Sequence, residues 1–183
     1  MGHLDICTVQ NSYPMKKLIS LFSLTICLTL NAQEMDKSLV QSTVTKLFVA
    51  TDQQDWSLVE AQFADKVHLD YSSMTGNPAA EVSPSEITSS WKTVLPGFDQ
   101  THHQIGNFIT EIIEDKATVF VYGTASHFLE NENGSVWTVV GSYDFDLEKT
   151  GSNWKITAMT FNYKFQDGNS GLIQKAIENA SKK

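Results

Sequence analysis

The chain has 183 residues, a net charge of −8 and no arginine, and 41% of its residues are hydrophobic. An acidic surface without guanidinium groups argues against recognition of nucleic acid, anionic lipid or phosphate groups. The length fits one domain with one hydrophobic core, and the ligand that we expect is a neutral small molecule.

A secretory signal peptide is predicted near the N-terminus. Two lysines follow Met15, an apolar run extends over residues 18–30, and Ala32 precedes the expected cleavage site. The run is shorter than the roughly 20 apolar residues that a membrane span needs. We therefore expect residues 1–32, an upstream extension and the signal peptide, to be removed. Residues 33–183 then form a single secreted or periplasmic domain that is not held in a membrane. The alternative interpretation is a buried N-terminal helix.

Both cysteines of the chain, Cys7 and Cys27, lie in the segment expected to be removed. The mature domain then has no thiol, so no disulfide, cysteine nucleophile or thiolate-bound metal is expected. Lipidation of Cys27 is a further alternative, which the bulky Ile26 before it disfavours. The histidines form no His-x-His or His-x-x-x-His pair, so we expect no metal, and the sequence has no glycine-rich phosphate loop, so we expect no cofactor.

The first half of the mature chain contains three predicted helices. Residues 35–51 space their apolar side chains along one helix face, and Asp55 is placed to cap a second helix over residues 56–62. Ser83-Pro84-Ser85-Glu86 predicts the start of a third helix, which we expect to end near Val94.

Alternating polar and apolar residues predict strands at residues 67–71, 102–113, 116–128, 136–147 and 154–163. Tight turns such as Glu114-Asp115 and Asn133-Gly134 join the last four into an antiparallel meander. An amphipathic helix is expected from Ser170 onward. Helices followed by a meander are typical of an α+β fold.

We expect the curved antiparallel sheet, closed over by the N-terminal helices, to form a cone around an internal pocket. Trp137, Gly141, Tyr143 and Phe145 share one face of their strand by alternation and are the predicted substrate-binding residues. Gly141, with Gly123 on the preceding strand, would leave room beside the aromatic rings. The alternative is a solid core with a bulge at each glycine.

Four polar residues are the candidates for catalysis: Asp52, Tyr71, His103 and His127. Imidazole, carboxylate and phenol groups suit acid–base chemistry on a neutral organic molecule, because histidine exchanges protons near neutral pH. His127 lies on the apolar side of its strand and must have a hydrogen-bonding partner there, so a satisfied core histidine is the alternative. His103 begins a row with Ile105 and Asn107 that we expect to face inward, whereas His102 is expected to face solvent. Asp52 ends a helix, where a carboxylate opposes the helix dipole, which favours a role inside the fold.

Several stretches resemble the SnoaL-like group of the nuclear transport factor 2-like superfamily. They are Ala50-Thr51-Asp52-Gln53-Gln54-Asp55-Trp56, Gly141-Ser142-Tyr143 and Asn153-Trp154-Lys155-Ile156. The resemblance covers residues 36–167, nearly the whole mature chain. It implies the cone fold described above.

Within the superfamily the chain is most similar to the scytalone dehydratase family. Asp52 matches the aspartate of that family's Tyr-Asp pair, Tyr71 the tyrosine of its Ile-Asp-Tyr-Arg-Ser strand, and His103 the histidine of its Thr-Gln-His strand start. The second catalytic histidine of the family falls on the strand that ends at His127. Thr51 replaces the tyrosine of the Tyr-Asp pair, which removes one of two phenols that orient the substrate carbonyl in that family.

The resemblance implies a cofactor-free lyase or isomerase that acts on a small cyclic or polyketide-like carbonyl compound. His103 and His127 would transfer the proton, Asp52 would orient one of them, and Tyr71 would polarise the carbonyl. We also expect a homo-oligomer, a dimer or a trimer. The alternative function is a non-catalytic protein of the same fold that binds a hydrophobic small molecule. A carboxylate base, as in the ketosteroid isomerases of the superfamily, is less favoured because the later strands offer no inward aspartate.

Overall fold

The structure is a computed structural model that describes the backbone of residues 15–182 and the side chains of residues 33–182. Two compact units are distinguished, Met1–Asp36 and Lys37–Lys183. The first includes the predicted extension and signal peptide, of which residues 1–14 lie outside the described residues and residues 15–36 are helical. No helix among the described residues is long and apolar enough to cross a membrane.

The helices follow the sequence patterns closely. Helix α1 (Met15–Asp52) buries the predicted apolar face, with Val44 and Leu47 fully inaccessible to solvent. Helix α2 (Trp56–Gln62) is capped by Asp55, whose carboxylate accepts a hydrogen bond from the Leu58 amide at 3.0 Å. Helix α4 (Pro84–Lys92) begins with a complete capping box and ends two residues before the predicted Val94. The short helix α3 (Ser72–Thr75) was not predicted.

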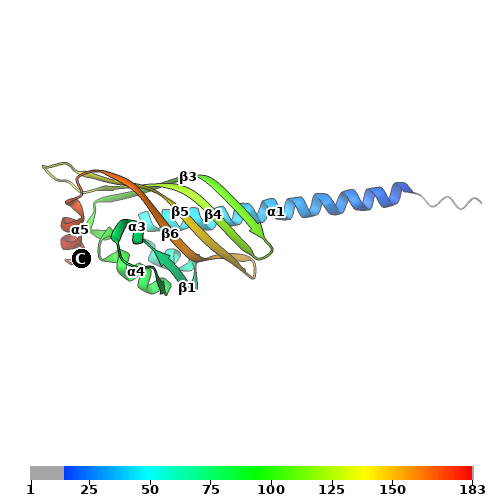
Figure 1. Ribbon diagram of the computed structural model, residues 1–183, viewed down its shortest axis with the longest axis horizontal. Helices are drawn as coiled ribbons and strands as arrows, with labels where there is room; N and C mark the ends of the chain where they lie inside the picture. The colour runs from blue at the N-terminus through cyan, green and yellow to red at the C-terminus, as the bar shows by residue number, and fades with distance from the viewer. Residues whose placement is uncertain (1–14, 183) are drawn as a thin grey trace, which may run out of the picture. The chain divides into compact units, whose positions relative to one another are not determined.

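One sheet of six strands forms the body of the unit (Figure 1). Its strands are β1 (Phe63–Asp70), β2 (Ala80–Val82), β3 (Gln100–Ile113), β4 (Lys116–Phe128), β5 (Val136–Thr150) and β6 (Asn153–Gly168). Their order is β2-β1-β6-β5-β4-β3. The predicted antiparallel meander is confirmed for β3 to β6, with β5 and β6 longer than expected. The sheet is nevertheless mixed, because β1 pairs with β6 in parallel.

A bulge in β3 decides which of its side chains face inward. The pairing with β4 shifts by one residue between Gly106 and Ile109, and Asn107 within the bulge has φ of 59°. His103 and Ile105 are half-buried on the inner side, whereas Asn107 and Ile109 are exposed. The prediction of an inward Asn107 is therefore wrong, because the extra residue reverses the alternation at that point.

The glycines of the inner sheet face admit aromatic rings and leave no free space of their own. A Cβ atom at Gly123 would lie 2.4 Å from the Tyr143 ring, and one at Gly141 would lie 2.5 Å from the Phe161 ring. The expectation of room beside the rings at these two positions is corrected: the rings themselves fill it.

The C-terminal helix α5 (Leu172–Ala180) closes one end of the unit against the 3-10 turn η1 (Leu95–Gly97). Leu172 and Ala176 are fully buried there. Gly97 allows the contact, because a Cβ atom at this position would lie 1.8 Å from the carbonyl oxygen of Ala176. This packing fixes the segment after α4, which forms one wall of the cavity described next.

Candidate active site

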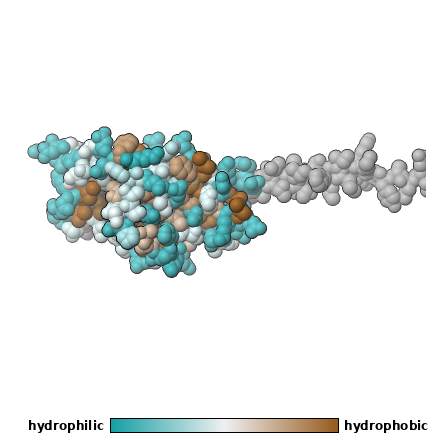
Figure 2. Space-filling model, in the orientation of Figure 1, coloured by the Kyte–Doolittle hydropathy of each residue, from teal (hydrophilic) through white to brown (hydrophobic). Residues whose placement is uncertain are grey.

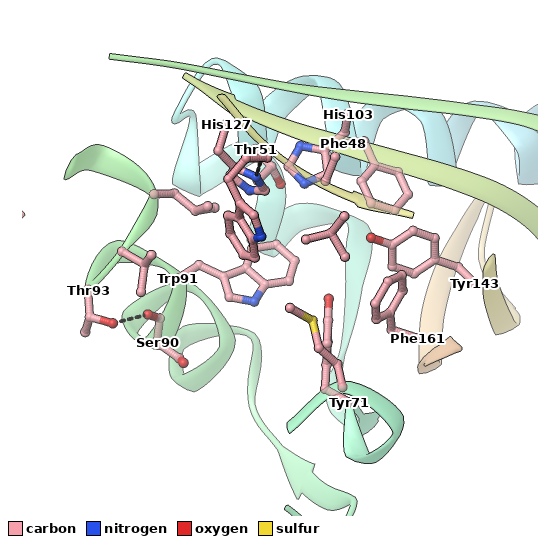
Figure 3. A pocket seen from close by; sticks show the side chains of 16 residues that line it. Phe48, Thr51, Tyr71, Ser90, Trp91, Thr93, His103, His127, Tyr143 and Phe161 are labelled. Atoms are coloured by element: carbon pink, nitrogen blue, oxygen red, sulfur yellow. Dashed lines mark hydrogen bonds between the residues drawn. The ribbon is translucent and has the colours of Figure 1, made fainter. Parts of the chain in front are cut away.

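A cavity of about 230 Å³ lies between the inner face of the sheet, the last turns of α1, and the segments α3, α4 and η1 (Figure 3). Among the described residues, no lysine, arginine, aspartate or glutamate lines it, and most of the lining is aromatic or aliphatic. Such a wall, with a few polar atoms, is typical of a small-molecule site. The lining residues are Phe48, Thr51, Tyr71, Met74, Ser90, Trp91, Thr93, Val94, Leu95, His103, Ala125, His127, Trp137, Val139, Tyr143 and Phe161.

The structure brings most of the predicted site residues to this cavity. Among the predicted catalytic residues, Tyr71, His103 and His127 line it, and Asp52 lies directly behind His103. Trp137 and Tyr143 also line the cavity.

Gly141 and Phe145 do not line the cavity, although they share the strand face of Trp137 and Tyr143. Phe161 covers Gly141, and Phe145 is buried in the core with its ring 6.2 Å from that of Phe48. The prediction for these two residues is corrected. Alternation gives the face of a strand, but α1 and neighbouring rings cover part of that face as core.

Asp52 and His103 form a tightly bonded pair between the end of α1 and the start of β3. The Asp52 carboxylate accepts hydrogen bonds from His103 Nδ1 at 2.7 Å, from the His103 amide at 2.7 Å and from Thr101 Oγ1 at 2.9 Å. Burial raises the pKa of Asp52, but the bonds and charge of His103, with the Thr101 hydroxyl, outweigh it and leave the pKa below its usual value. Because the carboxylate only accepts, Nδ1 of His103 carries the proton and Nε2 is the free ring nitrogen.

His127 has a different environment. Its ring is stacked on Trp137 with centroids 4.6 Å apart and lies 4.9 Å from the Phe98 ring. Burial, together with nearby His103, lowers the pKa of His127 to about 4, against the opposing effects of the Trp137 carbonyl and Asp52. The neutral imidazole donates from Nδ1 to the Trp137 carbonyl oxygen at 3.3 Å, which leaves Nε2 as an acceptor. The required partner of a buried histidine is thus a backbone carbonyl.

Several polar side-chain atoms of the lining residues have no hydrogen-bond partner among the described residues. Among the described residues, no fully buried side-chain nitrogen or oxygen lacks a hydrogen-bond partner. Nε2 of His103, Nε2 of His127 and the hydroxyls of Tyr71 and Tyr143 have no bonded partner among these residues, so they must be reachable from the cavity that their side chains line. The two imidazoles stand nearly perpendicular, at 83°, with centroids 6.0 Å apart.

Tyr71 is held in the cavity by the turn that follows it. It caps α3, whose Ser73 hydroxyl donates to the Phe161 carbonyl at 2.5 Å and accepts from the Tyr163 amide at 2.9 Å. Ser73 thereby bonds to the edge of β6 where β1 has ended. Burial, with a smaller contribution from Tyr143, raises the pKa of Tyr71 well above its usual value. The phenol is therefore a proton-retaining donor.

Sequence reasoning missed several cavity residues, notably Phe48, Trp91 and Phe161. Phe48 lies on the helix face of Thr51 and Asp52, one turn earlier, which was an available signal. Trp91 follows buried Ile87 by one helical turn on α4. Phe161 gave no signal of its own. Within the described residues, no three His, Cys, Asp or Glu side chains lie close enough to hold a metal ion.

Comparison with known proteins agrees with this fold. The family model of the SnoaL-like domain matches residues 35–160. A protein from Kribbella flavida has a similar structure, with a TM-score of 0.71 and 22% identity over 81% of this chain and 99% of that one. A scytalone dehydratase-like protein from Novosphingobium aromaticivorans has a TM-score of 0.65 and 15% identity over 76% and 91% of the two chains.

A hexachlorocyclohexane dehydrochlorinase from Novosphingobium barchaimii is also similar, with a TM-score of 0.63 and 13% identity over 76% of this chain and 93% of that one. No curated protein sequence matches the chain. At these identities the structural likeness shows the nuclear transport factor 2-like fold alone.

Proposed function

The chain belongs to the SnoaL-like domain family, and from this premise we propose that it is a cofactor-free acid–base lyase or isomerase of the dehydratase type. Its substrate is a small cyclic or polyketide-like carbonyl compound without charge. One observation carries the proposal: the Asp52–His103 pair shares a cavity with a second, neutral imidazole and with two phenol groups. The scytalone dehydratase-like and dehydrochlorinase structures, which share the fold, support the same class of reaction by analogy.

His103 is the base in this proposal. Nε2 takes the proton from the carbon beside the substrate carbonyl, and the electron pair of that C–H bond moves to the carbonyl oxygen. Asp52, bonded to Nδ1 at 2.7 Å, stabilises the imidazolium that forms. Tyr71 donates a hydrogen bond to the carbonyl oxygen, which gains negative charge as the proton leaves the carbon.

His127 holds the leaving group. Its Nε2 accepts a hydrogen bond from the β-hydroxyl of the substrate, because Nδ1 donates to the Trp137 carbonyl. The enolate then expels the hydroxyl, which receives the proton from His103 and leaves as water. The net change is the loss of water to give an unsaturated ketone; His103 moves the proton, and His127 positions the hydroxyl that leaves.

The test uses β-hydroxytetralone, a neutral cyclic β-hydroxyketone whose dehydration yields a fluorescent naphthol. The wild type should form naphthol, and His103→Ala should lose about 10²–10⁴-fold in rate. His102→Ala is the matched control, because this neighbour is exposed on the opposite side of β3. Equal rates for His103→Ala and wild type on a turned-over substrate would sink the proposal.

The alternative function is a non-catalytic protein that binds a hydrophobic small molecule. The aromatic lining, in which none of the described residues is a lysine, arginine, aspartate or glutamate, favours it independently of the histidines. Stabilisation of the protein by naphthol in a thermal-shift assay, reduced in His127→Ala, with no turnover of any carbonyl compound, would support this alternative.

We further propose that residues 15–32 direct export of the protein to a secreted or periplasmic location. The basic start, the apolar run and Ala32 support this. Mass spectrometry of protein recovered from an exporting host should show a chain that begins at or near Gln33. An intact N-terminus in the cytoplasmic fraction would contradict it.

A homo-oligomer, a dimer or a trimer, is the proposed assembly. Figure 2 shows separate hydrophobic patches on a largely hydrophilic surface, and Ile109, Tyr122 and Phe165 are among the exposed apolar side chains of the sheet. Sedimentation of the purified protein decides it, because a single monomer species at micromolar concentration would contradict the proposal.

A further inference from the structure

Two phenol hydroxyls enter the cavity from separate parts of the fold (Figure 3). Tyr71 comes from the junction of β1 and α3, and Tyr143 from the middle of β5. Both rings lie beside the Phe161 ring, with centroid distances of 5.7 Å for Tyr71 and 4.8 Å for Tyr143. One aromatic ring therefore packs against both phenols.

Among the described residues that line the cavity, none carries a permanent positive charge that could pair with an oxygen that becomes negative. The part of the cavity lining that the structure describes contains no lysine or arginine. The Thr51 hydroxyl is already committed, since it donates to the Leu47 carbonyl at 2.8 Å. The two phenols, by contrast, have no bonded partner among the described residues and retain their donor protons for a ligand.

We propose that Tyr71 and Tyr143 together form an oxyanion hole, which makes Tyr143 a second catalytic phenol and gives the cavity a preference for ligands that carry an enolate or phenolate oxygen. The inference rests on the proposed function, because proton abstraction beside a carbonyl produces an enolate oxygen. Two preorganised donors aimed at that oxygen stabilise the charge as it develops. Burial of both phenols raises their pKa values, so each donates a hydrogen bond without losing its proton.

The position of the Tyr143 ring requires a glycine at residue 123 on the neighbouring strand. A Cβ atom at Gly123 would lie 2.4 Å from Cε2 and 2.9 Å from Cδ2 of Tyr143. The ring could not keep its place beside a larger residue, so Gly123→Ala moves the phenol while leaving its hydroxyl present. Gly106 on the neighbouring strand is the matched control, since a Cβ atom there would contact nothing within 4 Å.

The experiment measures binding of para-nitrophenol, whose ionised form is seen by its absorbance, and of nitrobenzene, which lacks the hydroxyl. The wild-type protein should bind the ionised form, nitrophenolate. Bound nitrophenol should therefore stay ionised at pH values below the pKa that free nitrophenol has in solution. Tyr71→Phe and Tyr143→Phe should each weaken nitrophenolate binding by about 10–100-fold, the loss expected for one hydrogen bond to a charged oxygen. Nitrobenzene binding should be unchanged in both variants.

Gly123→Ala should weaken nitrophenolate binding as Tyr143→Phe does, and should add little further loss in the Tyr143→Phe background. Gly106→Ala should bind as wild type does. The inference is overturned if Tyr143→Phe binds nitrophenolate normally, or if it weakens nitrobenzene equally. This outcome is separable from failure of the proposed function. Tyr143-dependent nitrophenolate binding without turnover of β-hydroxytetralone would retain the oxyanion hole, whereas turnover dependent on His103 but not on Tyr143 would retain only the enzyme.

Discussion

The two histidines of the cavity occupy contrasting surroundings, although their ring centroids are only 6.0 Å apart. His103 lies near the edge of the sheet, where a carboxylate from α1 bonds both its ring and its amide. His127 lies one strand further in, among Phe98 and Trp137, with a backbone carbonyl as its hydrogen-bond partner.

The difference shows how neighbours divide one residue type into two chemical roles. A carboxylate partner stabilises the charged imidazolium, which a base needs after it has taken a proton. An apolar pocket with a carbonyl partner keeps the ring neutral and fixes which nitrogen accepts. In our proposal His103 therefore changes protonation state during the reaction and His127 does not.

The largest expected effect is the unequal loss of activity from the two histidines. His103→Ala should lower the rate of β-hydroxytetralone dehydration by about 10²–10⁴-fold, as expected for loss of a general base. His127→Phe should cost about tenfold, since it keeps a ring but removes the nitrogen that accepts a hydrogen bond from the substrate. Steady-state kinetics of both variants check this. Equal losses would show that the two rings share one role.

Asp52→Asn should give His103 the uncharged partner that His127 already has. An amide cannot stabilise the imidazolium as a carboxylate does, so we expect a rate loss on the order of 10²-fold with the fold intact. Kinetics and circular dichroism of the variant, with Asp55→Asn as a surface control, provide the measurement. A rate within a factor of two of wild type would remove Asp52 from the mechanism.

The same contrast should appear in the pH dependence of stability. Unfolded His127 gains a proton near pH 6.5, but the folded residue does so only near pH 4, so the unfolded state binds more protons between these values. The free energy of unfolding should therefore fall as the pH drops from about 6.5 to 4, by on the order of 3 kcal/mol. Asp52, whose folded pKa is lowered, contributes stability above pH 3.8 that is lost only at lower pH.

Urea unfolding of wild type and His127→Gln across this range tests the assignment. The variant should show a flatter profile between pH 6.5 and 4. His102→Gln, a change of the same type at an exposed position of β3, is the control and should keep the wild-type slope. A wild-type slope in His127→Gln would mean that another group accounts for the acid sensitivity.

Much of the fold could be predicted because local patterns agree with it. Alternation and two tight turns predict strands β3 to β6, and Asp55 and Ser83 mark the starts of two helices. The parallel pairing of β1 with β6 could not be predicted, because it depends on tertiary contacts between distant segments. Strand β2 has three residues and is too short to show a period.

The candidate site was partly predictable for a similar reason. The Glu114-Asp115 turn sets the pairing of β3 with β4, but without the bulge near Asn107 that pairing would place His103 beside outward-facing Ser126. With the bulge, His103 pairs with Ala125 and faces inward. The inward orientation was therefore reached through the resemblance and the local alternation, while the register that produces it was not visible in the sequence.

The smallest effect that we predict concerns Thr101, whose hydroxyl donates the third hydrogen bond to Asp52 at 2.9 Å. Thr101→Val keeps the shape of the side chain and removes this donor, which should cost about 1 kcal/mol of stability near neutral pH. Because the bond favours the ionised carboxylate, its loss should also raise the pKa of Asp52 toward its ordinary value and move the acid unfolding midpoint to higher pH.

Thr118→Val, on the exposed side of β4, is the control for the change in side-chain type. The slope between pH 6.5 and 4 belongs to His127 and should stay as in wild type. If Thr101→Val changes the slope between pH 6.5 and 4 and does not shift the acid midpoint, then Thr101 acts on His127 and not on the Asp52–His103 pair.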